Sequence, residues 1–174
     1  DLFGFTKMNY GKISMNVGKV DIVKLLGQLL EEFYPSFADR DLTYELKSNV
    51  PSQVISADGN LLARLFDNLI NNAIKYTPPG TEIDVTWERR GSWIQVSVSD
   101  TGPGVPEQAK PHIFDMFYSA SDPVADSRRS MGLGLALCKS IVNAHGGEIA
   151  VSDRSPHGAI FTFSVPTGEV ELHE

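Results

Sequence analysis

One helix with a marked beginning and a marked end constrains the fold of this chain more than any other feature. Asp58 is a residue type that caps helix N-termini, and the segment after it repeats apolar side chains at helical spacing. Residues 77–80, Thr-Pro-Pro-Gly, end the repeat because proline cannot continue the helical hydrogen-bond ladder. The side chains expected on its buried face are Leu62, Leu65, Phe66, Leu69 and Ala73. The sequence therefore predicts an amphipathic helix between Asp58 and Thr77.

Further helices and strands are predicted from the same kind of spacing. A helix capped by Asp21 carries the apolar residues Ile22, Leu25, Leu26, Leu29, Leu30 and Phe33, and another runs from Met131 to Ala144. Alternating residues predict strands at 42–46, 53–56, 82–88, 93–99, 148–152 and 158–165, with residues 89–92 joining a hairpin. Helices interleaved with hairpins imply an α+β fold, a two-layer α/β sandwich. Its sheet is expected to be mixed, mostly antiparallel and covered on one face by helices.

Composition is that of one ordinary globular domain. The 174 residues are 41% hydrophobic, enough to bury a core without metals or disulfides. The single cysteine, Cys138, excludes an internal disulfide and fits a reducing compartment. No apolar run approaches the roughly 20 residues that span a bilayer, so we expect a soluble fragment without membrane contact. The net charge of −7 argues against binding to nucleic acid.

Asparagines are out of place in the helix after Asp58. Asn68 and Asn72 are four residues apart and Lys75 is three further on, so the three side chains project from one stripe. Asparagine is a poor helix former because its amide competes for backbone hydrogen bonds. Amide oxygens beside an ammonium group suit a hydrated Mg²⁺ ion and the phosphates that accompany it. The stripe therefore indicates a nucleotide site.

Two glycine-containing turns fit the same kind of site. Asp100 begins the sequence Asp-Thr-Gly-Pro-Gly, in which Gly102 and Gly104 would let the backbone approach a purine closely. Gly132 and Gly134 precede a helix, whose free N–H groups and positive dipole end favour a phosphate. The second turn lacks the third glycine of a dinucleotide fingerprint and the Gly-Lys-Ser/Thr of a P-loop. Each turn also has a plain explanation, as an Asp-Gly turn or as a glycine-rich helix start.

The order of these segments resembles the catalytic ATP-binding domain of sensor histidine kinases, in the superfamily shared with gyrase, Hsp90 and MutL. Residues 68–76 match the family's N box, 100–104 its G1 box, 113–118 its F box and 132–135 most of its G2 box. Residues 126–139 look more narrowly like potassium-responsive sensor kinases. The resemblance implies the Bergerat ATP-binding fold in residues 17–167, the tail of a dimerisation and phosphoacceptor helix in residues 1–16, and a C-terminal tail in residues 168–174.

The resemblance assigns metal and phosphate roles within the N box. Asn72 would be the principal Mg²⁺ ligand and Asn68 its supporting partner. Lys75 would contact a phosphate, and Tyr76 would form a wall of the nucleoside pocket. Structural roles stay open for the last two, because a tyrosine that ends an amphipathic helix often packs in the core and a lysine there complements the helix dipole.

The resemblance also assigns the contacts to base and phosphates. Asp100 would accept a hydrogen bond from the adenine amino group, where guanine presents a carbonyl. Gly102 and Gly104 would lie against the base. The phosphates would meet the G2 residues Gly132, Leu133, Gly134 and Leu135. Ala159 stands where relatives often carry threonine or serine. This replacement would weaken the affinity for the nucleotide.

The polar, non-periodic run from Ser119 to Ser130 is a candidate lid over the nucleotide. Phe114 and Phe117 are expected to pack at its base. Ser119 stands where many relatives have an arginine thought to touch the γ-phosphate. Either Arg128 or Arg129 would take that role, although solvated loop charges explain them as well.

Position 68 separates two activities within the superfamily. The gyrase, Hsp90 and MutL branch places a glutamate there to activate water, whereas Asn68 cannot act as a base. The resemblance therefore implies an ATP-dependent protein histidine kinase that uses ATP and Mg²⁺. An ATP-hydrolysing conformational switch, or a nucleotide-sensing module without transfer activity, is the alternative.

The phosphoacceptor is expected to lie outside this chain. None of the four histidines, His112, His145, His157 and His173, stands in the acidic helical context that the family uses. The implied partners are the protein's own dimerisation domain and a response regulator. The implied location is the cytoplasmic part of a membrane-anchored bacterial sensor kinase.

Overall fold

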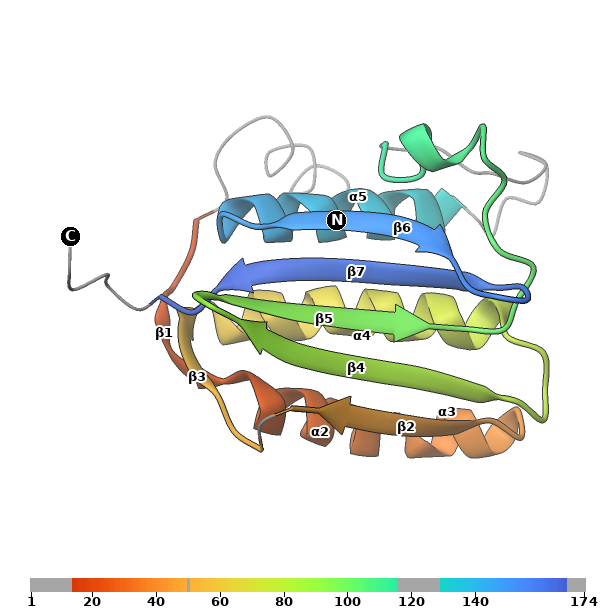
Figure 1. Cartoon of the computed structure of the whole chain (residues 1–174), viewed down its shortest axis with the longest axis horizontal. Coiled ribbons are helices and arrows are strands. Elements are labelled where there is room, and N and C mark those ends of the chain that lie inside the picture. Colours follow the sequence, from red (N-terminus) through yellow and green to blue (C-terminus); the bar gives the residue numbers. More distant parts are fainter. Residues whose placement is uncertain (1–13, 50, 116–128, 169–174) are drawn as a thin grey trace.

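A five-stranded sheet and a layer of helices make up the protein (Figure 1). This computed structural model describes residues 14–49, 51–115 and 129–168, and for residues 129–133 it describes the backbone only. The strands are β1 (Gly18–Asp21), β2 (Thr43–Ser48), β3 (Val54–Ala57), β4 (Glu82–Arg90), β5 (Trp93–Ser99), β6 (Glu148–Asp153) and β7 (Ala159–Pro166). The helices are α2 (Ile22–Glu32), α3 (Tyr34–Asp39), α4 (Gly59–Tyr76), the short 3-10 helix η1 (Lys110–His112) and α5 (Arg129–Ala144).

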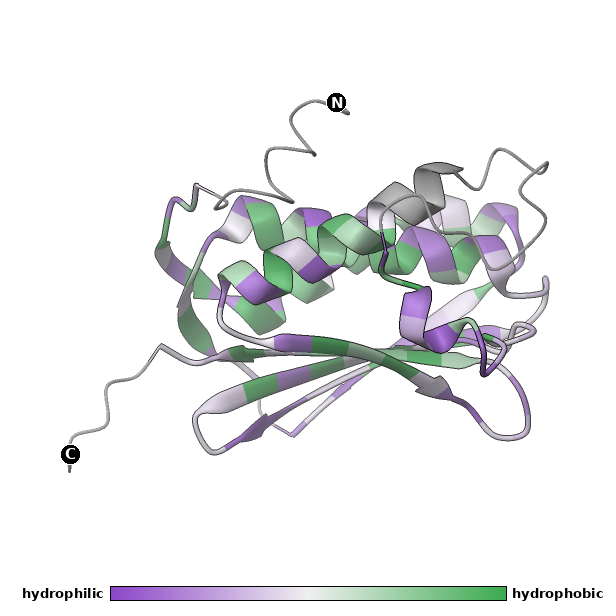
Figure 2. Cartoon of the chain, turned by 90° about the horizontal axis from the view of Figure 1, so that it is seen from above, coloured by the Kyte–Doolittle hydropathy of each residue, from purple (hydrophilic) through white to green (hydrophobic). Residues whose placement is uncertain are grey.

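The main sheet is mixed, in the order β2-β4-β5-β7-β6. Only β2 and β4 pair in parallel, while β5 pairs antiparallel with β4 and with β7, and β7 with β6. Figure 2 shows the helices on one side of this sheet. The predicted α+β two-layer sandwich is confirmed.

Alternation along the strands directs one face of the sheet toward the helices. In β4 and β5 the buried residues alternate with more exposed ones, so Val85, Trp87, Val96 and Val98 lie in the core. The helices supply the opposite wall of that core, including Leu65, Phe66 and Leu69 of α4 and Ile141 of α5. Cys138 is fully buried in the same cluster, and burial raises the pKa of its thiol. Its predicted packing role is confirmed.

Asp58 begins α4 and joins three distant parts of the chain. Its Oδ1 accepts from the N–H of Leu61 at 3.1 Å, which is the expected cap. Its Oδ2 accepts from the N–H of Asn16 at 2.8 Å. Its own N–H donates to Nε2 of His145 at 3.1 Å, and Nδ1 of that ring donates to the carbonyl of Ile141 at 2.9 Å. Asp58 therefore holds the segment before β1 and the end of α5 together.

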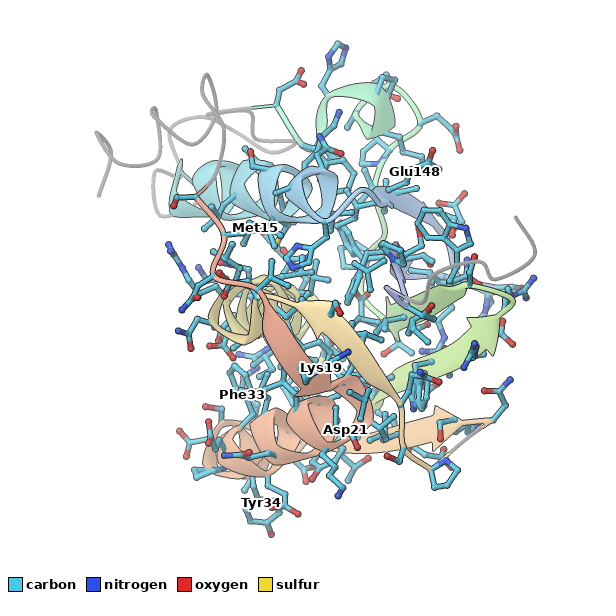
Figure 3. All side chains as sticks on the ribbon, turned by 90° about the vertical axis from the view of Figure 1, so that its left-hand side faces the viewer. Met15, Lys19, Asp21, Phe33, Tyr34 and Glu148 are labelled. Atoms are coloured by element: carbon cyan, nitrogen blue, oxygen red, sulfur yellow. The ribbon has the colours of Figure 1, made fainter. Side chains whose placement is uncertain are left out.

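Figure 3 views the molecule from this end. Met15 and Lys19 lie along the segment that leads to Asp21. Asp21 caps α2 as predicted, with Oδ1 accepting from the N–H of Val23 and of Lys24. Glu148, at the beginning of β6, lies at the same end of the molecule.

Three details differ from the prediction. The strand near residues 53–56 pairs with β1 in a separate two-stranded sheet instead of joining the main one. The hairpin turn is shorter, since Arg90 still pairs with Trp93 and only Gly91 and Ser92 lie between the strands. Strand β1 and helices α3 and η1 were not predicted. No helix among the described residues is long and apolar enough to cross a membrane.

Candidate nucleotide-binding site

Three segments that the sequence assigned to one site meet at one end of the two layers, on the right in Figure 1. They are the last turns of α4, the loop after β5 and the first turns of α5. A Cβ added to Gly102 would lie 2.4 Å from the carbonyl oxygen of Tyr76, and one added to Gly134 would lie 2.9 Å from Oδ1 of Asn68. The asparagine-bearing helix therefore contacts both glycine segments.

Asp100 is a buried, well-held acceptor at the beginning of the loop after β5. Asp100 is only 4% exposed. Oδ1 accepts from the N–H of Gly102 at 2.8 Å and of Ala159 at 3.4 Å, while Oδ2 has no hydrogen bond with any described residue. Burial raises the pKa of the Asp100 carboxyl, partly opposed by these two N–H groups and by the charge of Arg154. One free carboxylate oxygen held in place is what recognition of an exocyclic amino group requires.

Glycines bring the backbone of this loop close to the turn before β7. Gly104 has a φ of +82°, and a Cβ there would lie 3.1 Å from the carbonyl oxygen of Gly158. Gly158 has a φ of +122°, and its Cβ would lie 1.9 Å from the carbonyl oxygen of Asp100. Side chains at either position would push the two loops apart.

Asn72 carries a largely buried amide on α4. It is 5% exposed and makes no hydrogen bond with any residue that the structure describes. One turn earlier, Asn68 is half-buried and its Nδ2 donates to the carbonyl of Arg64 at 2.9 Å. Oδ1 of Asn68 is then the atom nearest Gly134. Asn71, between them in sequence, is exposed.

The end of α4 carries the other two N-box residues. Lys75 is exposed in the last turn, where its charge complements the helix dipole. Tyr76 is half-buried, and its backbone lies against Gly102. Both positions agree with the predicted roles without testing them.

Helix α5 begins at Arg129, two residues earlier than the predicted Met131. Its first turns include the backbone of Gly132, Leu133 and Gly134, and Leu135 is buried. The side chain of Arg129 lies outside the described part. So do Arg128, Ser119, Phe117 and the rest of residues 116–128, so the predicted lid contacts stay predictions. Phe114, at the near edge of that segment, packs edge-to-face on Phe161 with ring centroids 6.1 Å apart.

These residues fit a Mg²⁺-nucleotide. The observation is the combination of the largely buried amide of Asn72 and the Oδ2 atom of Asp100, neither of which a described residue engages, with glycines that let the surrounding segments approach closely. Asn72 with Asn68 would hold the metal and Asp100 the base. A bound Mg²⁺ ion would neutralise charge on the phosphates, which is the chemistry that phosphoryl transfer needs.

Sequence reasoning missed the residues that support Asp100 from the loop between β6 and β7. Arg154 donates from Nη1 to Oγ of Ser99 at 3.1 Å and from Nη2 to Oδ2 of Asp84 at 3.1 Å. Nδ1 of His157 donates to the carbonyl of Gly102 at 3.2 Å. These contacts join residues far apart in sequence, so no local pattern signals them.

The fold and the site together define an ATP-binding α+β domain. Residues 57–169 match the family described as histidine kinase-, DNA gyrase B-, and HSP90-like ATPase, and the chain belongs to this family. The resemblance drawn from the four sequence boxes is thereby confirmed.

Several proteins to which this chain is similar are sensor histidine kinases. Sensor protein KdpD of Clostridium acetobutylicum is 36% identical over 95% of this chain. A crystal structure of full-length ShkA in complex with AMPPNP is 28% identical over 98% of this chain, with a TM-score of 0.84. Histidine kinase ThkA in complex with the response regulator TrrA is 26% identical over 95% of this chain, with a TM-score of 0.76. The chain spans 18% of KdpD, 35% of the ShkA chain and 47% of the ThkA chain.

Proposed function

We propose that this domain binds Mg²⁺-ATP and transfers the γ-phosphoryl group to a histidine on the dimerisation domain of its own protein. The phosphoryl group then passes to a response regulator. Support comes from the family, from the similarity to ShkA with AMPPNP and to ThkA with TrrA, and from the site geometry.

The proposal gives individual residues the roles that the family resemblance implies. Asn72 and Asn68 hold the metal, and Lys75 contacts a phosphate. Asp100 accepts from the adenine amino group through Oδ2. Tyr76, Gly102 and Gly104 enclose the base, the backbone of residues 132–135 faces the phosphates, and Arg128 or Arg129 approaches the γ-phosphate.

The observation that carries kinase activity, rather than hydrolysis, is the amide at position 68. Asn68 lies between Arg64 and Gly134 on the side of α4 that contacts α5. An amide accepts no proton at neutral pH, so it cannot activate water as a general base. The bound ATP is therefore not hydrolysed by activated water and remains available to a nucleophile from another domain.

Phosphoryl transfer requires the site mainly to align the reactants and to compensate charge. A histidine nitrogen forms a bond to the γ-phosphorus while the bond to the bridging oxygen breaks and ADP leaves. Because this transition state is loose, charge compensation and alignment supply most of the acceleration. His145 is not the acceptor, since both of its ring nitrogens are engaged in the core.

Calorimetric titration with ATP, and with GTP as control, tests the first half of the proposal. With Mg²⁺ present, the wild type should bind ATP in preference to GTP, and Asp100→Asn should abolish that preference. A folded wild type that binds neither nucleotide would contradict the proposal.

Labelled ATP tests the second half. The chain alone should incorporate little γ-phosphate, and addition of a phosphoacceptor domain should give acid-labile labelling of that domain. Steady phosphate release without the acceptor would favour the hydrolysing switch. ATP binding with neither release nor labelling would favour a nucleotide-sensing module.

Three broader assignments belong to the proposal as well. The catalytic domain occupies residues 17–167, between the tail of the dimerisation helix and a C-terminal tail. The parent protein is a membrane-anchored bacterial sensor kinase whose catalytic part is cytoplasmic. A potassium-responsive subtype is supported by the resemblance over residues 126–139.

A further inference from the structure

The loop between β6 and β7, residues 154–158, is the support on which the Asp100 loop rests. The N–H of Asp100 donates to the carbonyl of Ala159 at 2.9 Å, immediately after this loop. Gly158 lies against the carbonyl of Asp100, and His157 donates to the carbonyl of Gly102. The loop is closed on itself by the N–H of Arg154, which donates to the carbonyl of Gly158 at 3.0 Å.

Arg154 extends this support across the sheet. From the end of the edge strand β6 its guanidinium reaches Ser99 of β5 and Asp84 of β4, each at 3.1 Å. Ser99 and Asp84 are themselves register partners. The arginine side chain is 24% exposed and that of Asp84 is 21% exposed, so the ion pair is largely shielded from water. Since Ser99 precedes Asp100, this contact fixes the point from which the carboxylate enters the site.

Arg154 also acts on the charge of Asp100. Among the described residues it is the cation whose charge opposes the burial that raises the pKa of Asp100. The surrounding elements carry other titratable groups: Lys75 and Tyr76 on α4, Asp84 with Glu82 on β4, and His157 in the supporting loop. Glu82 and Asp84 add negative charge on the outer face of the sheet, where the pKa of Glu82 is raised by burial and by Asp84.

We propose that Arg154 is a positioning residue that sets the base specificity of the nucleotide site, by fixing Ser99 and by placing its positive charge at the start of the Asp100 loop. This inference rests on the proposed ATP binding at Asp100. It assigns a role in nucleotide selection to a residue outside the four sequence boxes.

Selection follows from the hydrogen-bonding state of one oxygen. Oδ1 of Asp100 is engaged by two N–H groups, so a proton taken up by the carboxylate would reside on Oδ2. Ionised Oδ2 accepts from the adenine amino group and repels the guanine carbonyl. Protonated Oδ2 becomes a donor, which suits a carbonyl and opposes an amino group. Loss of Arg154 should therefore reduce the preference for ATP over GTP, and more so as the pH falls.

Arg154→Met and Arg154→Lys separate the charge from the geometry. ATP and GTP affinities would be measured by calorimetry from about pH 5 to about pH 9, after unfolding curves show that each variant is folded. In Arg154→Met the loss of ATP affinity on acidification should begin at a higher pH than in the wild type. The preference for ATP over GTP should fall by at least about threefold at pH near 6. Arg154→Lys should recover most of the wild-type pH profile, because the charge remains.

Three matched variants complete the test. Arg90→Met removes an exposed arginine at the far hairpin and should leave the profile unchanged. His157→Asn removes the imidazole while keeping a donor near Gly102, and should retain the loss of ATP affinity on acidification. Ser99→Ala removes one contact of Arg154 without changing charge, and should weaken ATP binding at all pH values alike.

The outcomes distinguish this inference from the proposed function. A wild type without ATP binding would overturn the ATP proposal itself. A wild type that binds ATP, together with a folded Arg154→Met whose pH profile and nucleotide preference match it, would overturn the role of Arg154 alone.

Discussion

Gly134 of α5 lies against Asn68 of α4 so closely that a Cβ on the glycine would stand 2.9 Å from the Asn68 Oδ1 atom. This contact joins the two sequence segments that the kinase resemblance assigns to metal and phosphates. The atom in the way is the far end of a side chain, so a larger residue at 134 would rotate Asn68 without repacking the core.

Gly134→Ala should therefore weaken Mg²⁺-ATP binding while the domain stays folded. Alanine improves helix propensity by about 1 kcal/mol, which offsets the local crowding. We expect an affinity loss of about tenfold, equivalent to about 1.4 kcal/mol, measured by calorimetry.

Gly27→Ala is the matched control, because a Cβ on Gly27 in α2 meets nothing within 4 Å. It should gain the same helix propensity and leave binding unchanged. The double variant Asn68→Ala/Gly134→Ala tests the mechanism, since the two losses should be strongly non-additive. Simple additivity would show that Gly134 acts by another route.

Asn72→Ala should abolish Mg²⁺-ATP binding and leave the free domain as stable as the wild type or more stable. No hydrogen bond joins the Asn72 side chain to any described residue, so its removal should leave none of their polar groups unpaired. Urea unfolding should show a gain of up to about 1 kcal/mol, helped by the better propensity of alanine. Asn71→Ala, one position earlier and exposed, should gain propensity alone and bind ATP normally. Strong destabilisation by Asn72→Ala would mean that the amide has a structural role.

Asp100→Asn should stabilise the free domain at neutral pH while it removes ATP binding. Burial raises the folded-state pKa of Asp100 above its unfolded value. The stability linked to its protonation is therefore present below the unfolded pKa and is lost as the pH rises through the folded pKa. Asparagine keeps an oxygen for the two N–H donors and avoids the buried charge.

Thermal unfolding at several pH values measures this effect. The advantage of Asp100→Asn over the wild type should grow as the pH rises through the folded pKa, and should vanish at about pH 3. An advantage that does not change with pH would contradict the explanation.

Asp58→Ala should destabilise the domain by about 1–2 kcal/mol at neutral pH through loss of the α4 cap. Burial alone would raise the pKa of Asp58, but hydrogen bonds from the backbone N–H groups of Asn16, Leu61 and Asn60, together with His145, lower it on balance. A lowered folded-state pKa means that this stability is present above the unfolded pKa, and is lost as the pH falls through the folded pKa.

Denaturant titrations of wild type and Asp58→Ala should accordingly converge below about pH 4. Asp39→Ala serves as the control, because Asp39 is exposed at the end of α3 and caps no N-terminus. A difference that persists unchanged into acid would argue against the ionised cap.

Local chemistry explains which elements could be predicted from sequence. Helix α4 lies between Asp58 and Thr77 as expected, because a cap and a proline pair act within a few residues. The strand β1 was missed because it exists through pairing with β3, which no short window contains. Helix α3 begins at Tyr34 and is six residues long, too short for apolar spacing to reveal it.

The site divides in the same way. Asn68, Asn72, Asp100 and the glycines stand in short motifs whose residue types already suggest a ligand. Arg154 stands in no motif, and its part in the site depends on the sheet order that brings β6 and β7 beside β5. Residues whose function depends on strand order cannot be found from spacing alone.

The hydrogen bond between Asn16 and Asp58 lies at one end of the domain, and the candidate nucleotide site lies at the other. Helix α4 begins beside this hydrogen bond and ends beside Gly102. Its 18 residues separate the two ends by about 27 Å. A rotation at Asn16 would therefore carry bound phosphates through a wide arc while every contact around Asp100 and Asn72 stayed as it was. The domain would turn as one rigid body about Asn16 and could bring bound ATP to an acceptor without any change in its binding site.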